Sequence, residues 1–84
     1  MFKVGDVLEE GPVRIKLIEI YPYFSGAHRM EYRVTYQITN APPGKDIGHF
    51  WFPRFGDTDE RMRAEIKKVA KYYQNVMKPM LGIK

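Results

Sequence analysis

Basic residues are the chemistry-bearing side chains that this sequence concentrates most strongly. Residues 61–84 hold seven Lys and Arg against Glu65 alone, whereas residues 1–42 hold five basic and five acidic residues. Four of the cations recur one or two helical turns apart: Arg63, Lys67, Lys71 and Lys78. Such a row attracts phosphate groups and releases their counterions. Solvation of an exposed helix face and complementation of the helix dipole explain the same residues, and the sequence leaves both explanations open.

A second set of polar side chains occupies alternate positions in two β-rich segments. Arg33, Thr35 and Gln37 alternate with apolar residues, and Arg14 and Lys16 do so in the preceding segment. If these segments are neighbouring strands, the five side chains share one face of a sheet, away from the core. A sheet surface with these hydrogen-bonding groups can contact a nucleic-acid groove.

The single tryptophan, Trp51, stands between Phe50 and Phe52. In a strand the pleat sends Trp51 to the face opposite its two neighbours. We expect core packing or a cover from another part of the chain, although an exposed tryptophan would stack a base. If Ile18 and Ile20 share its side of the sheet, the three form an apolar patch that monomers seldom expose. Pairing into a homodimer, sheet to sheet or edge to edge, would cover that patch.

Other reactive side chains are sparse. The chain has no cysteine, which excludes disulfides, thiol catalysis and thiolate-bound metals. His28 and His49 lack companions at metal-ligand spacing, and Ser25 lacks the surroundings of a nucleophilic serine. The acidic run 57–60 lacks the glycine and distal Glu of a calcium loop. We therefore expect no enzymatic activity, no metal, no cofactor and no small-molecule substrate.

Strand patterns indicate what positions these side chains. Residues 30–39 alternate strictly between apolar and polar, which predicts a strand with one buried and one wet face. Residues 13–21 are also β-rich, but their apolar phase changes near Leu17 and Ile18. Either a bulge corrects the register or the second half of this strand is apolar on both sides. Residues 22–29 are predicted to connect the two strands as a long hairpin loop.

Two shorter strands complete the expected sheet. Residues 47–52 predict a third strand, stopped by Pro53, whose missing N–H suits a strand end. Residues 4–10 predict a short fourth strand, turned by Gly11 and Pro12. The connections are short, so the pairing is expected to be antiparallel.

An amphipathic helix is expected at the C-terminal end. Asp57 and Glu60 have the spacing of a capping box, and Thr58 is a second candidate cap. Apolar residues then recur at spacings of four and three, with two more beside them: Met62, Ile66, Val69, Tyr73 and Val76, flanked by Ala70 and Met77. The helix is expected to end before Pro79 and Gly82.

These patterns predict one α+β domain over residues 1–84. It consists of a three- or four-stranded antiparallel sheet with the C-terminal helix packed on one face, in two layers. The composition, with 44% hydrophobic and 29% charged residues, is that of a globular protein. No apolar run is long enough to span a bilayer or serve as a signal sequence, so we expect a cytoplasmic protein without membrane contact.

The functional expectation is a small basic protein that binds DNA or RNA. Phosphate contacts would come from the helix cations or from the sheet cations, with Trp51 stacking; the candidates are Arg63, Lys67, Lys71 and Lys78 on the helix and Arg14, Lys16 and Arg33 on the sheet. The alternative is a protein-interaction module or a homodimeric structural protein that binds through the outer face of the sheet.

Overall fold

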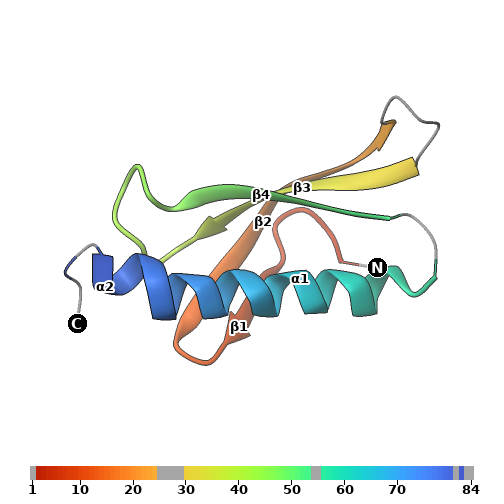
Figure 1. The fold of residues 1–84 in the computed structure, drawn as a ribbon. Coiled ribbons are helices and arrows are strands. Elements are labelled where there is room, and N and C mark those ends of the chain that lie inside the picture. Colours follow the sequence, from red (N-terminus) through yellow and green to blue (C-terminus); the bar gives the residue numbers. More distant parts are fainter. Residues whose placement is uncertain (1, 25–29, 54–55, 81, 83–84) are drawn as a thin grey trace.

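Four antiparallel strands and a C-terminal helical segment form the fold of the computed structural model, which describes residues 2–24, 30–53, 56–80 and 82 (Figure 1). The strands follow one another in the sheet in chain order. Their bounds are β1 Val7–Glu10, β2 Val13–Phe24, β3 Met30–Ile38 and β4 Ile47–Pro53. The helical segment packs on one face of this sheet, which confirms the predicted α+β architecture.

Two strand boundaries differ from the prediction. β1 begins at Val7 instead of residue 4, because residues 3–6 form a turn in which the Lys3 N–H donates to Asp6 Oδ2 at 2.8 Å. β2 continues to Phe24, so the first part of the predicted 22–29 connection is strand. Aromatic residues in this stretch favour extended backbone. Residues 25–29 of that connection lie outside the described residues.

A β-bulge in β2 corrects the phase of its apolar residues. The register with β3 shifts between Leu17 and Glu19, and Ile18 is the extra residue. Side chains alternate with a period of two, so one inserted residue moves Ile20 to the same face as Leu17. Ile20 accordingly packs against the core. Of the two alternatives left open by the sequence, the bulge is confirmed.

The helical segment comprises α1 Thr58–Tyr72, a π-helical turn η1 Tyr73–Met77, and α2 Lys78–Met80. Asp57 is the N-cap of α1, and its Oδ1 accepts the Glu60 backbone N–H at 3.1 Å. This bond confirms the predicted cap, because it satisfies one of the backbone donors that the first helical turn leaves free.

The π turn changes which residues face the sheet. The Lys78 N–H donates to the carbonyl of Tyr73, five residues earlier. One more residue per turn brings Met77 against the core, while Val76 is 38% exposed. The predicted apolar stripe is therefore wrong at Val76. The helix was also predicted to end before Pro79, and this is wrong, since α2 includes Pro79. A proline has no N–H for the regular i→i−4 hydrogen bond, and the preceding π turn already interrupts that pattern.

The core lies between the inner face of the sheet and the helix. It takes apolar side chains from β2, β3, β4 and the helical segment: Val13, Ile15, Leu17, Val34, Ile38, Phe50, Phe52, Met62, Ile66, Ala70 and Tyr73. No polar side chain of the described residues is buried there. The helix covers one face only (Figure 1), so the opposite face of the sheet remains available for contacts.

Replacement of single helix side chains by alanine tests this packing. Ile66 is 1% exposed and Val76 is 38% exposed. We expect Ile66→Ala to lower the free energy of unfolding by about 2–4 kcal/mol because it leaves a cavity. Val76→Ala is expected to cost less than about 1 kcal/mol. Urea denaturation followed by circular dichroism measures both, and equal losses would contradict the helix phase described here.

Candidate nucleic-acid interfaces

The cations of the helix lie on its exposed side. Arg63, Lys67 and Lys71 are exposed, and Lys78 is half-buried. The Arg63 guanidinium carbon lies 5.0 Å from the centre of the Phe2 ring, a cation–π contact with the N-terminal segment. The structure thus brings three of the four predicted helix cations together on one accessible surface, which we call the helix cationic side: Arg63, Lys67 and Lys71.

Two of these cations have no acidic neighbour. Within the described part of the chain, Lys67 and Lys71 make no ion pair and no hydrogen bond, whereas Lys68 pairs with Glu65 at 3.3 Å. No acidic residue follows Glu65 in the helical segment. The positive potential of the second half of the helix is therefore not neutralised locally.

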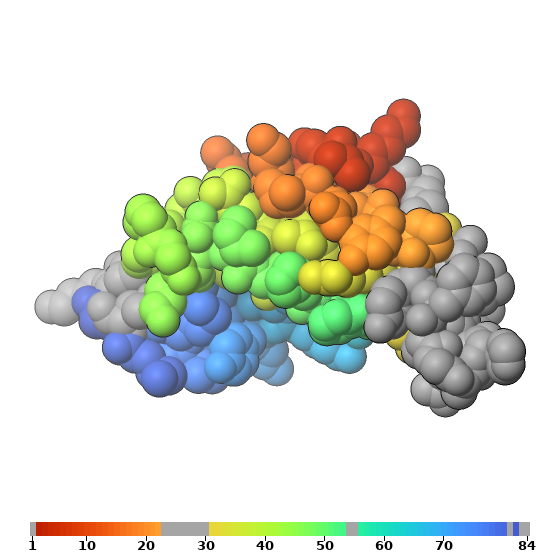
Figure 2. Space-filling view, turned by 90° about the horizontal axis from the view of Figure 1, so that it is seen from above, coloured from red at the N-terminus to blue at the C-terminus, as the bar shows by residue number. Residues whose placement is uncertain are grey.

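The predicted sheet residues share the outer face, the one turned away from the helix. Lys16 lies opposite Gln37, and Arg33 lies opposite Trp51. Arg14 stands two residues before Lys16 in the same strand, so it points to the same side. Figure 2 looks onto this face, with β2 in orange, β3 in yellow and β4 in green. The structure confirms that these polar side chains point away from the core.

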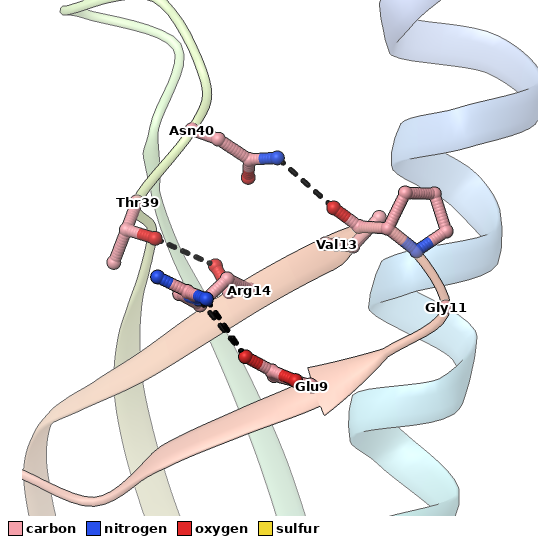
Figure 3. Close-up of a pocket in the computed structure, with 7 residues that line it drawn as sticks. Glu9, Gly11, Val13, Arg14, Thr39 and Asn40 are labelled. Atoms are coloured by element: carbon pink, nitrogen blue, oxygen red, sulfur yellow. Dashed lines mark hydrogen bonds and ion pairs between the residues drawn. The ribbon is translucent and has the colours of Figure 1, made fainter.

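The outer face is electrically balanced, unlike the helix. Arg14 donates from Nε and Nη2 to Glu9 Oε1, at 3.1 and 2.9 Å (Figure 3). Two further acids lie on the same face: the bulge turns Glu19 to it, opposite Thr35, and Glu31 stands two residues before Arg33 in β3. Three cations are thus matched by three acids on the described strands: Arg14, Lys16 and Arg33 by Glu9, Glu19 and Glu31.

Trp51 faces outward and is 48% exposed. The expectation that it packs in the core or is covered is wrong, because no helix or strand of the described residues covers the outer face. Its contacts are with Arg33, whose guanidinium carbon lies 5.9 Å from the indole centre, and with the His49 ring at 6.4 Å. The three-residue apolar patch considered from the sequence does not form, since the bulge turns Ile20 inward and leaves Ile18 and Trp51 as its exposed members.

Sequence reasoning missed a tyrosine that holds Arg33. The Arg33 guanidinium lies 5.6 Å from the Tyr21 ring centre, and its Nη1 donates to the Tyr21 hydroxyl at 2.6 Å. Tyr21, Arg33 and Trp51 thus form one row across β2, β3 and β4, which we call the aromatic row. The sequence signal for Tyr21 was the change of apolar phase in residues 13–21. Only if this change is a bulge does Tyr21 lie on the outer face.

One pocket among the described residues is a structural junction. It has a volume of about 390 Å³ and lies between the β1–β2 turn and the segment after β3 (Figure 3). The Asn40 side-chain amide donates to the Pro12 carbonyl at 3.0 Å, and the Thr39 hydroxyl donates to the Arg14 carbonyl at 3.4 Å. These polar groups, like the Arg14–Glu9 pair beside them, satisfy one another, so they join the two loops.

The described ranges contain neither a metal-binding cluster nor a membrane-spanning helix. No group of three or more His, Asp or Glu residues there could hold a metal ion. No helix in the same ranges has both the length and the apolar character that a membrane span requires.

Comparison of the chain with models of known protein families, with curated proteins and with solved structures found no match. The geometry of the two surfaces is therefore the basis for inferring a function.

A hydrogen bond at one end of the outer face gives a pH-dependent prediction. The Gln37 side-chain amide donates to Asp46 Oδ2 at 2.8 Å, and this bond lowers the pKa of the Asp46 carboxyl below 3.8. The hydrogen bond therefore stabilises the folded state at a pH above the ordinary pKa of an aspartate. This stabilisation is lost as the pH falls through the lowered pKa of Asp46. In Gln37→Leu we expect the pKa of Asp46 to rise, whereas Thr35→Ala leaves it unchanged. Carboxyl-detected NMR titration measures both, and an unchanged Asp46 pKa in Gln37→Leu would contradict the assignment.

Proposed function

We propose that the protein binds nucleic acid through the helix cationic side, with phosphates contacted by Arg63, Lys67 and Lys71. The observation that supports this choice is that Lys67 and Lys71 are exposed and unpaired within the described part of the chain. A cation without a local acid is free to exchange its solvent counterions for phosphates. On the outer face Arg14 is paired with Glu9, and the strands carry as many acids as cations, which makes that face the weaker phosphate site.

The spacing of the three cations suits contact with a polyphosphate backbone. Successive members stand four residues apart, about 6 Å along the helix axis. Long, flexible side chains at this interval can each reach a separate phosphate. Contacts of this kind position a protein on nucleic acid without reading bases. The proposed binding is therefore largely independent of sequence and steeply dependent on salt.

Protein interaction through the outer face is the alternative, and it has weaker support. Val7 and Ile47 are 51% and 55% exposed there, but they lie at opposite edges of one cross-strand row. Lys16 and Gln37 stand between them. The exposed apolar side chains are therefore separated by polar ones, instead of forming the continuous patch typical of a stable protein interface.

Charge reversal distinguishes the helix from the rest of the surface. We expect Lys67→Glu/Lys71→Glu to weaken binding to a labelled duplex. The plot of log affinity against log salt is expected to become less steep, by about two in the magnitude of its slope. The matched control is Lys16→Glu/Lys45→Glu, which makes the same change in net charge at two exposed lysines outside the helix. Fluorescence anisotropy between about 50 and 200 mM salt measures both variants.

The control decides the interpretation. The proposal expects the control variant to retain most of the wild-type affinity and salt slope. Equal losses in the two double variants would show that only net charge matters and would contradict a site on the helix. Absence of wild-type binding to duplex, single-stranded DNA and RNA at about 150 mM salt would overturn the proposed function.

A further inference from the structure

The aromatic row on the outer face has the features of a second ligand site. We infer that it binds an unpaired nucleobase, which stacks on Trp51 beside the Arg33 guanidinium. This inference rests on the proposed function for its class of ligand, but it uses the face opposite the helix cationic side. DNA and RNA single strands offer the same base chemistry, and the experiment below separates them.

Trp51 provides the stacking surface. Its side chain is 48% exposed, although it is flanked by Arg33 in the next strand and by His49 in its own strand. These neighbours, together with the strand backbone, limit the orientations of the indole before a ligand arrives. A base that stacks on it gains contact without the cost of ordering a flexible side chain. Base–aromatic stacking is sequence-tolerant because every base has a π face.

Arg33 provides a held hydrogen-bond donor at the edge of this surface. Nη1 is fixed on the Tyr21 hydroxyl, and Nε is shielded from solvent without a hydrogen-bond partner among the described residues. Nη2 has no partner among them either. A guanidinium N–H beside a stacked ring suits the oxygen and nitrogen acceptors on the edge of a base. Thr35 and His49, joined at 3.0 Å, lie in the neighbouring row and add polar groups.

The charge of the outer face favours a base over a phosphate. Glu19 and Glu31 lie near the row on the same face, so a phosphate would meet acids as well as Arg33. A neutral ring avoids this repulsion. A second copy of the chain is a poorer occupant, because symmetric stacking of two aromatic rows would bring both Arg33 side chains together. The row lies on the face of the sheet opposite the helix, the face onto which Figure 2 looks, and a base of an extended strand can approach from that side.

The test uses the fact that Trp51 is the only tryptophan of the chain, so tryptophan fluorescence, excited at a wavelength that tyrosine does not absorb, reports on this site alone. Eight-nucleotide oligo(dT) and oligo(rU) and a duplex of equal length are titrated at about 150 mM salt. We expect saturable quenching with the single strands and none with the duplex. In the Lys67→Glu/Lys71→Glu background the quenching is expected to persist, because the aromatic row does not include the helix.

Substitutions then identify the contact. In the Lys67→Glu/Lys71→Glu variant, the added substitution Trp51→Ala is expected to weaken binding of labelled oligo(dT) and oligo(rU) about 5- to 100-fold, as measured by anisotropy. Trp51→Phe, which keeps an aromatic ring, is expected to lose less. Trp51 is outside the core, and circular dichroism verifies that each variant is folded. If only one of the two oligomers binds, that result names the strand type.

The failures of the two proposals are distinguishable. Binding by anisotropy without a change in Trp51 fluorescence would overturn the base site and leave the helix site standing. Quenching that is lost in Lys67→Glu/Lys71→Glu would also overturn a separate site. A fluorescence change on dilution of the protein alone would assign the row to self-association instead. Unchanged single-strand affinity in Trp51→Ala would contradict the contact directly.

Discussion

Burial of one sheet face under a single helical segment is the constraint on which the rest of the structure depends. The core combines residues of β2, β3 and β4 with Met62, Ile66, Ala70 and Tyr73 of the helix. A short chain buries a smaller fraction of its surface than a long one, so each of these contacts matters. The described part of the chain has no second helix to cover the other face of the sheet. That face must therefore be compatible with water, which explains its polar and charged residues.

Two insertions keep the apolar residues directed into this core. The bulge at Ile18 turns Ile20 toward the helix, and the π turn brings Met77 toward the sheet. Both devices act by adding one residue to a regular period, two in the strand and 3.6 in the helix. Their consequences extend to the surface, because the bulge also places Tyr21 beside Arg33 on the outer face.

The sequence was sufficient where a pattern is local. The strict alternation of residues 30–39 predicted β3, which ends one residue earlier, and the spacing of Asp57 and Glu60 predicted the helix cap. The π turn was not predictable, since its i→i−5 bonding depends on how Tyr73 and Met77 pack against the sheet. A local pattern also cannot show which elements will cover a given strand face, so the exposure of Trp51 was missed.

Of the two candidate sites, the helix cationic side could be predicted from the sequence and the aromatic row could not. The excess of cations in the helix was visible in the sequence, because it needs only a count of charges. The balance of charge on the outer face was not, because it depends on the bulge and the cross-strand register that place Glu9 beside Arg14 and Glu19 on the same face as Lys16. Register thus sets the distribution of charge on the sheet, whereas the proposed phosphate surface on the helix follows from the count of charges alone.

The central claim is that nucleic acid meets two separate surfaces on opposite layers. Amide and indole chemical shifts in ¹H–¹⁵N NMR spectra, followed during titration with a duplex that carries a single-stranded tail, test it most directly. The account predicts one group of shifts around Arg63, Lys67 and Lys71 and a second at the Trp51 indole and Arg33, with the core strand positions unchanged. Shifts confined to other surfaces, or no shifts at about 150 mM salt, would contradict it.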